Sequence, residues 1–268
     1  MKRFLTAACV AATLVLGLVI ARPAHAKVHG KLVEYKDGDT VLEGYLAVDD
    51  AAKGKRPGIL VVHAWMGIDD NVKKHTDLLA QLGYVALAAD IYGKGVRPKD
   101  KDEAGKLAGK YKGDRTLLRQ RVTAGLTELT KQTNVDVAKT AAVGYCFGGT
   151  TVLELARSGA QIAGVVTVHG GLDSPTPADG KNIKAKVLVL HGAADPYSKP
   201  ADVAAFQKEL TDAKVDWQFD QFGGAVHCFT DPTAGSDAAQ GCAYDAAADK
   251  RSWTAMKAFF DELFATKK

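Results

Sequence analysis

The sequence predicts an α/β fold with a mostly parallel central sheet, helices on both faces and an antiparallel hairpin at its start. Apolar, β-branched segments alternate with segments of helical spacing along most of the chain. Several apolar segments are continuous, which is typical of strands that are buried on both faces. The 268 residues, 47% of them hydrophobic, are enough for one large core and favour a single domain.

The elements follow in a regular order. GKLVEYK and TVLEGYLAV flank Asp37-Gly38, a turn pair that predicts an antiparallel hairpin. Strands are then predicted at 58–64 and 84–90, with a helix at 71–83 between them. A polar, helix-prone region from about 100 to 132 has room for a lid-like insertion. Beyond it, the patterns predict strands at 140–146, 162–170, 185–192 and 215–222, and helices at 148–159, 200–213 and 243–265.

Residues 1–26 have the features of a secretory signal peptide. Two basic residues precede an apolar run at 4–21, and AHA at 24–26 forms a small-x-small cleavage site. Because this run approaches the length of a spanning helix, an uncleaved membrane anchor is the alternative. We predict cleavage after Ala26 and one domain over 27–268, in a secreted, periplasmic protein that does not associate with the membrane.

Removal of this leader changes the charge balance. Loss of Lys2, Arg3 and Arg22 would leave 32 basic residues against 31 acidic ones, a net charge of +1 instead of +4. Such a balance does not predict a nucleic-acid partner. The glycine pairs lack the spacing of a phosphate-binding loop, so we expect no nucleotide cofactor.

Export also bears on the cysteines that remain after cleavage, Cys146, Cys228 and Cys242. An oxidising compartment favours disulfides, and Cys228 and Cys242 lie on either side of the loop FTDPTAGSDAAQG. We predict that these two pair and close the loop. Cys146 is then an odd thiol, which needs an explanation in an exported protein.

Cys146 follows a predicted strand within GYCFGG, at the end of a sheet where parallel folds place their chemistry. Gly144 and Gly148 supply the small residues that a strained strand-to-helix turn around a nucleophile requires. The helix N-terminus lowers the pKa of a nearby thiol and increases its thiolate fraction. The amide of Phe147, directly after the thiol, is a natural oxyanion donor.

Asp195 and His227 complete the order nucleophile, acid, histidine, and each lies just past a predicted strand. His227 would pair with or deprotonate the thiol, and Asp195 would accept the other imidazole N–H and fix its tautomer. Asp195 could instead only start a turn, because Asp-Pro commonly does so. Asp90 is the second choice for the acid.

Over essentially the whole chain after the leader, the sequence resembles the dienelactone hydrolase family of α/β-hydrolases. GYCFGG, HGAADP and HCF match its three catalytic blocks, and HAWMGI and GYVALAADIYGKG match its oxyanion loop and the following strand and loop. The resemblance implies hydrolysis of a small ester or lactone through an acyl-enzyme thioester, without a metal or organic cofactor. It assigns Cys146 as nucleophile, His227 as base and Asp195 as its orienting acid, with the amides of Trp65 and Phe147 as oxyanion hole.

Three positions depart from the family pattern. Members that cleave dienelactone have a glutamate in the oxyanion loop that helps to activate the thiol, and Ala64 stands there in this chain. They bind the substrate carboxylate through two arginines, and the matching residues are Lys94 and Asp231. We therefore expect an uncharged ester or lactone rather than dienelactone. A thiolate needs less help from a base than a hydroxyl does, which would compensate for the missing glutamate.

Several side chains near the strand ends are candidates for the mouth of a substrate pocket, with ordinary packing as the alternative for the aromatic ones. They are His63, Trp65, Met66, Tyr92, Lys94 and Phe229. Strand-end histidines in such sheets are more often hydrogen-bonded scaffold than reactants. We therefore expect that His63, His169 and His191 do not take part directly in catalysis.

Two other functions stay open. A low-pKa thiol oxidises readily, and without the activating glutamate it would suit a non-catalytic or redox-responsive binding protein on a hydrolase scaffold; the set Cys146, Asp195 and His227 opposes this. An acyltransferase or thioesterase would use the same intermediate, and competition between an acceptor and water distinguishes it. In each case we expect a monomer that acts on a small molecule.

Overall fold

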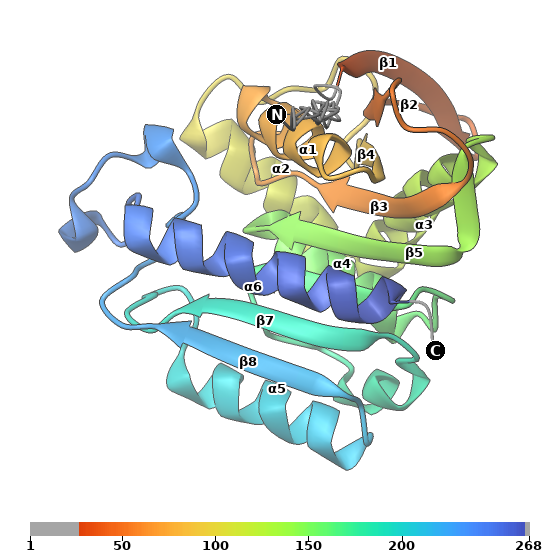
Figure 1. Cartoon of the computed structure of the whole chain (residues 1–268). Helices are drawn as coiled ribbons and strands as arrows, with labels where there is room; N and C mark the ends of the chain where they lie inside the picture. Colours follow the sequence, from red (N-terminus) through yellow and green to blue (C-terminus); the bar gives the residue numbers. More distant parts are fainter. Residues whose placement is uncertain (1–26, 266–268) are drawn as a thin grey trace, which may run out of the picture.

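The structure, a computed structural model, describes residues 27–265, so the predicted signal peptide lies outside the described residues. One sheet of eight strands has the order β1-β2-β4-β3-β5-β6-β7-β8 (Figure 1). The first three strands in this order pair antiparallel and all later neighbours pair parallel. The strands are β1 (Val28–Asp37), β2 (Thr40–Asp49), β3 (Arg56–Val62), β4 (Val85–Ala89), β5 (Val135–Tyr145), β6 (Gly164–Val168), β7 (Lys186–Gly192) and β8 (Trp217–Phe222). This confirms the predicted mostly parallel sheet with an N-terminal antiparallel hairpin.

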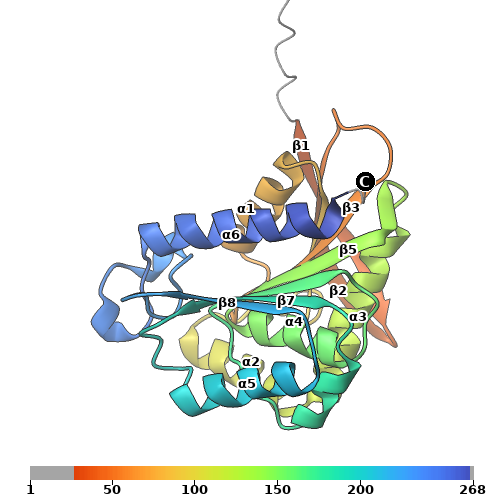
Figure 2. The ribbon, with the colours of Figure 1, turned by 60° about the horizontal axis from the view of Figure 1, so that its bottom comes forward.

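Helices cover both faces of the sheet. The α-helices of the described chain are α1 (Asp70–Gln81), α2 (Lys101–Gly113), α3 (Arg115–Lys131), α4 (Phe147–Arg157), α5 (Pro200–Asp212) and α6 (Ala246–Phe264). α1 and α6 lie on one face and α2, α3, α4 and α5 on the other (Figure 2). In β3, Leu60 and Val62 face the second layer, while Ile59 and Val61 face the first. The continuous apolar segments therefore arise because both sides of each central strand are buried.

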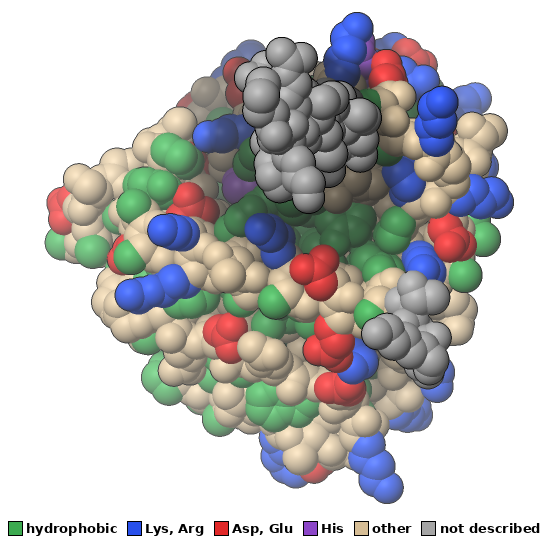
Figure 3. Space-filling model, viewed as in Figure 1, with side chains coloured by type: hydrophobic (Ala, Val, Ile, Leu, Met, Phe, Trp, Pro, Cys, Tyr) green, Lys and Arg blue, Asp and Glu red, His purple; other side chains and the backbone are tan. Residues whose placement is uncertain are grey.

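The surface over α1 and α6 carries basic and acidic side chains interspersed with one another (Figure 3). Within residues 27–265, every helix is too short or too polar to cross a membrane.

The opening hairpin turns one residue later than predicted. Asp37 pairs with Thr40, so the two-residue turn consists of Gly38 and Asp39. Gly38 has φ of +55°, a left-handed conformation that glycine adopts at low cost. Positive φ at the first turn residue alone is the pattern of a type II′ turn, whose twist matches that of paired strands.

The helix-prone region from 100 to 132 forms two helices and not a lid. Its break lies at Asp114, whose side chain accepts the N–H of Leu117 at 2.9 Å and thereby caps α3. Both helices bury one face in the core, α2 through Tyr111 and α3 through Leu118 and Val122. The region that had room for a lid-like insertion is thus part of the helical layer, because its apolar residues recur at helical spacing.

Candidate active site

The turn that carries Cys146 connects β5 to α4 and is strained. Cys146 has φ of 53° and ψ of −113°, a conformation that costs energy for any residue with a side chain. A Cβ on Gly148 would lie 2.7 Å from the carbonyl oxygen of His63, and one on Gly144 would lie 2.8 Å from the nitrogen of Gly149. Only glycines permit this close approach, which holds the thiol at the carboxyl end of the sheet.

Cys146, His227 and Asp195 meet at this edge. Nε2 of His227 lies 3.0 Å from Sγ of Cys146, and its Nδ1 lies 2.8 Å from Oδ2 of Asp195. The other oxygen of Asp195 accepts the N–H of Tyr197 at 2.8 Å, which orients the carboxylate. Asp195 is buried, while His227 retains a 12% exposed side chain, so a small molecule can reach the imidazole.

The charges of this group stabilise one another. Burial raises the pKa of the Cys146 thiol, but the charge and hydrogen bond of His227, together with two backbone N–H groups, lower it overall. Burial lowers the pKa of His227, yet the charge of Cys146 and the hydrogen bond that His227 donates to Asp195 raise it well above its ordinary value. The favoured resting state is therefore a thiolate beside an imidazolium.

Two backbone amides point at the sulfur. The N–H groups of Phe147 and Trp65 both hydrogen-bond it and help to lower its pKa. His63 lies beneath the Trp65 loop, with Nδ1 2.6 Å from the carbonyl oxygen of Ala64, while Nε2 accepts the N–H of Ile91 at 3.3 Å. That carbonyl belongs to the same trans peptide as the Trp65 N–H, so the bond from His63 fixes where this N–H points.

The segment that carries His227 is held on both sides. Cys228 and Cys242, the pair predicted to close this loop, are joined by a disulfide in the structure. The N–H of His227 donates to the carbonyl of Gly241 at 3.2 Å, and its own carbonyl accepts the N–H of Ala243 at 3.0 Å. The far end of the loop therefore returns to the backbone of His227 itself.

The residues predicted to line a substrate pocket lie in different places. Trp65 and Met66 are half-buried in the loop that follows β3, and the Trp65 N–H hydrogen-bonds the Cys146 sulfur. His63, Tyr92 and Phe229 are buried, so they support the site from behind instead of lining it. Lys94 also differs from expectation, because it pairs with Glu34 and lies 3.9 Å from Glu43 at the hairpin. Asp90, the second choice for the acid, accepts the N–H groups of Tyr92 and Gly93 after β4 and that of Glu43 in β2, and it does not contact His227.

Two residues of the site were missed by the sequence reasoning. Tyr197 is 64% exposed, and its ring lies 5.2 Å from that of His227 in an edge-on contact. Thr230 is buried and contacts His169. Their only sequence signal was proximity to Asp195 and His227, because neither residue type has a spacing that marks it.

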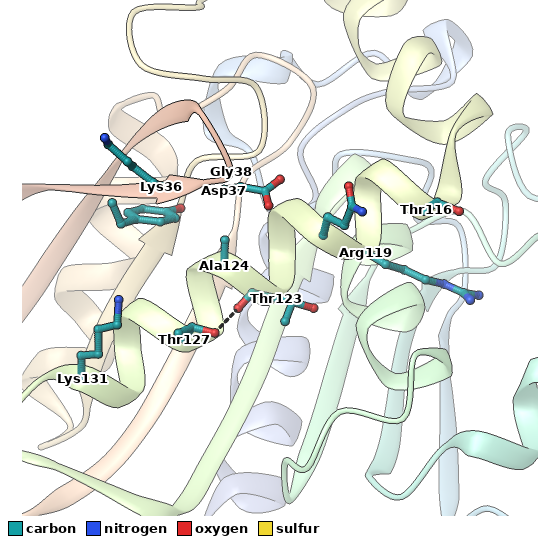
Figure 4. A pocket seen from close by; sticks show the side chains of 11 residues that line it. Lys36, Asp37, Gly38, Thr116, Arg119, Thr123, Ala124, Thr127 and Lys131 are labelled. Atoms are coloured by element: carbon teal, nitrogen blue, oxygen red, sulfur yellow. Dashed lines mark hydrogen bonds between the residues drawn. The ribbon is translucent and has the colours of Figure 1, made fainter.

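A hollow of about 570 Å³ lies elsewhere, between the β1–β2 turn and α3 (Figure 4). Among its charged residues, Arg119 binds Glu154 and Asp179, and Asp37 binds Arg121. It does not include Cys146. Over the described residues, no group of three or more His, Cys, Asp or Glu side chains is arranged to hold a metal ion.

Replacing His227 by alanine is expected to shift alkylation of Cys146 to higher pH. The charge and hydrogen bond that lower the thiol pKa are lost while burial remains. Each unit of increase reduces the thiolate fraction at neutral pH about tenfold. The rate constant for iodoacetamide, measured against pH, checks this, with exposed His29→Ala as matched control. An unchanged profile would contradict the ion pair.

The sheet order, the strained turn and the meeting of cysteine, histidine and aspartate at strand ends define the class of the protein as an α/β-hydrolase. The model of the dienelactone hydrolase family matches residues 42–264, so the chain belongs to this family and is a hydrolase of esters or lactones.

Relatives support the assignment. P91, solved as a dienelactone hydrolase-like promiscuous phosphotriesterase from metagenomic libraries, is 43% identical with a TM-score of 0.84, over 89% of this chain and 99% of P91. A protein of Aquifex aeolicus whose name refers to carboxymethylenebutenolidase is 28% identical over 75% of this chain and 87% of its own length. An uncharacterised Caenorhabditis elegans protein is 37% identical over 55% of this chain and 95% of its own.

Proposed function

We propose that the protein cleaves uncharged carboxylic esters or lactones by covalent catalysis, with Cys146 as nucleophile, His227 as proton carrier and Asp195 as its orienting acid. The observation that carries this proposal is the 3.0 Å contact between Sγ and Nε2, beside two amides aimed at the sulfur. Membership of the family supports the class of bond.

In the first step the thiolate attacks the carbonyl carbon. As the sulfur bonds to carbon, the carbonyl oxygen takes up the negative charge and accepts the N–H groups of Trp65 and Phe147. The C–O bond then breaks, and the imidazolium of His227 protonates the departing alkoxide. An acyl thioester on Cys146 and a neutral His227 remain. For a lactone, the new alcohol stays attached to the acyl chain.

Water completes the cycle. Neutral His227 takes one proton from water while the oxygen attacks the thioester carbon. Collapse of this intermediate releases the carboxylic acid and restores the thiolate beside the imidazolium. Asp195 stabilises the charged His227 at each stage where it forms and holds the tautomer that can accept a proton at Nε2.

An uncharged substrate follows from the two positions that match the family's arginines. The ammonium of Lys94 is held by Glu34 at the hairpin. Asp231 follows the His227 segment, and its carboxylate accepts the N–H of Thr233 at 2.9 Å. Asp69 lies at the start of α1 beside the oxyanion loop. Burial raises the pKa of its carboxyl most, and the negative charge of Asp231 raises it further. Two acids in this region disfavour an anionic substrate.

The test is to look for the intermediate itself. Protein that begins at Lys27 is mixed with p-nitrophenyl acetate and with a small neutral lactone, and turnover is followed. Intact mass and peptide mapping after acid quench locate the acyl group. Repeated turnover with acylation of Cys146 is the expected result. No turnover and no adduct would favour the non-catalytic alternative, and product formed only with an added alcohol or thiol would favour the acyltransferase.

Tyr197 is expected to contact the alcohol portion of the substrate, because the leaving group must lie beside His227. Tyr197→Ala should reduce kcat/KM for p-nitrophenyl esters about fivefold, since a lost aromatic contact costs about 1 kcal/mol. The deacylation rate, measured after the alcohol has left, should stay unchanged. Tyr197→Phe is the matched control. Equal losses in acylation and deacylation would place Tyr197 outside the leaving-group site.

A second candidate activity is hydrolysis of neutral phosphotriesters, favoured by the 43% identity to P91, whose name refers to that activity. The two amides on the sulfur could equally stabilise a developing phosphoryl oxyanion. Release of p-nitrophenol from diethyl p-nitrophenyl phosphate, lost in Cys146→Ala, is the expected result. Phosphotriesterase turnover that persists in that variant would contradict it.

We also propose export to the periplasm. The leader pattern of 1–26 and the Cys228–Cys242 disulfide support it, because disulfides persist in oxidising compartments. N-terminal sequencing of protein from a periplasmic fraction should begin at Lys27, and recovery of the full chain from the membrane fraction would indicate the anchor.

A further inference from the structure

His169, at the exit of β6, lies between the two segments that carry Cys146 and His227. It is 3% exposed, and its backbone is fixed by an N–H bond to the carbonyl of Leu190 at 2.8 Å. Its φ of 39° is left-handed, a conformation that is uncommon for a residue with a bulky side chain. Such a conformation persists only where the surroundings impose it, and it aims the ring toward the site.

Both ring nitrogens of His169 are occupied, and together they determine the tautomer. The N–H of Cys146, which also donates to Val168 O at 3.0 Å, lies 3.1 Å from Nδ1, so this nitrogen accepts. The proton is then on Nε2, which lies 2.8 Å from Oγ1 of Thr230 and donates to it. Burial, and next the charge of His227, keep the pKa of His169 well below its usual value. A neutral ring is the only form in which Nδ1 can accept.

The packing around this ring joins the same two segments. The His169 ring lies 5.2 Å from the ring of His227 and meets Phe229 edge-on at 5.0 Å. Thr230 follows His227 by three residues, in the segment that the disulfide closes. Beside the ring, Gly170 and Gly149 approach so closely that a Cβ on Gly170 would lie 2.8 Å from the Gly149 Cα. The backbone at the exit of β6 therefore lies in direct contact with the backbone at the start of α4.

We infer that His169 is a positioning residue that links the Cys146 turn to the His227 segment through Thr230 and so keeps Sγ and Nε2 at their contact distance. It moves no proton in the reaction. The inference deepens the proposed function and rests on it. The link is specific, because Nδ1 binds the Cys146 turn and Nε2 binds the His227 segment at Thr230.

The test separates the two bonds. His169→Asn keeps an acceptor near Nδ1 but does not reach Thr230, while His169→Phe keeps the ring and loses both bonds. Thr230→Val removes only the hydroxyl in a nearly isosteric side chain. We expect His169→Phe and Thr230→Val to lower kcat for p-nitrophenyl acetate about tenfold with KM nearly unchanged, since small misplacements are costly in an oriented site. Both should also shift the alkylation of Cys146 to higher pH.

The two changes should not add. Thr230→Val introduced into His169→Phe is expected to cause no further loss, because the bond between them is already absent. His169→Asn should match Thr230→Val in kcat. Thr76→Val is the matched control, since Thr76 is a fully buried threonine whose hydroxyl bonds within α1 at 2.7 Å. Its kcat and alkylation profile should equal those of the wild type.

Several outcomes would overturn the inference. A wild-type alkylation profile in Thr230→Val would show that the link does not position the thiol, and equal losses from Thr230→Val in both backgrounds would show that Thr230 acts independently of His169. If His169→Phe does not fold, as judged by thermal unfolding, Thr230→Val decides alone. Alkylation needs no substrate, so it tests the link even if no ester is turned over, and a failure of the proposed function stays distinguishable.

Discussion

Replacing Cys146 by alanine is expected to lower kcat for p-nitrophenyl acetate about 10⁴-fold or more, to the level that binding and the oxyanion donors alone provide. The change removes the thiolate and the acyl-enzyme with it, while His227 and the two amides remain. KM should change little, because the sulfur contributes to the transition state and not to ground-state binding. Initial rates with and without enzyme measure the effect.

Cys146→Ser is the matched variant for this prediction. It keeps the size of the side chain, but a hydroxyl needs an active base, and the ion pair that makes the thiolate is lost. We expect the kcat of Cys146→Ser to lie between the values for Cys146→Ala and the wild type. Turnover in Cys146→Ala close to that of the wild type would place the chemistry elsewhere and contradict the proposed mechanism.

Replacing Arg157 by alanine is expected to reduce the free energy of unfolding by about 3 to 5 kcal/mol, because it leaves the buried carboxylate of Glu209 without its cation. Arg157 is fully buried at the end of α4, with Nε and Nη2 donating to the two oxygens of Glu209 at 2.8 and 2.7 Å. Nη1 donates to Glu154 at 3.0 Å. Such bidentate bonds join the C-terminal end of α4 to α5.

Urea unfolding at neutral pH measures this change, and Lys208→Ala is the matched control. Lys208 pairs with Asp212 at 2.7 Å on the exposed surface of α5, and such pairs contribute little. The control should lie close to the wild type. A loss in Arg157→Ala as small as that of the control would mean that Glu209 finds another partner.

The sequence by itself determined the elements and their order, because both are encoded locally. Continuous apolar runs such as 58–64 are buried on both faces whatever their neighbours are, and the glycines around Cys146 mark a turn in which a Cβ does not fit. Strand exits also identified Cys146, Asp195 and His227 as candidates, since parallel strands end at one edge. That these three side chains meet within 3.0 Å is visible only in the folded chain.

The tertiary structure alone decided which polar side chains support the site and which do not. Lys94 was expected at the substrate, but the opposite charge of Glu34 holds it at the N-terminal hairpin. His63 and His169 belong to one residue type at equivalent strand exits, yet one orients the Trp65 peptide and the other bridges to Thr230. These differences depend on which atoms, distant in sequence, lie within hydrogen-bond reach. No local pattern encodes them, because a buried polar group takes whatever partner the packed fold brings to it.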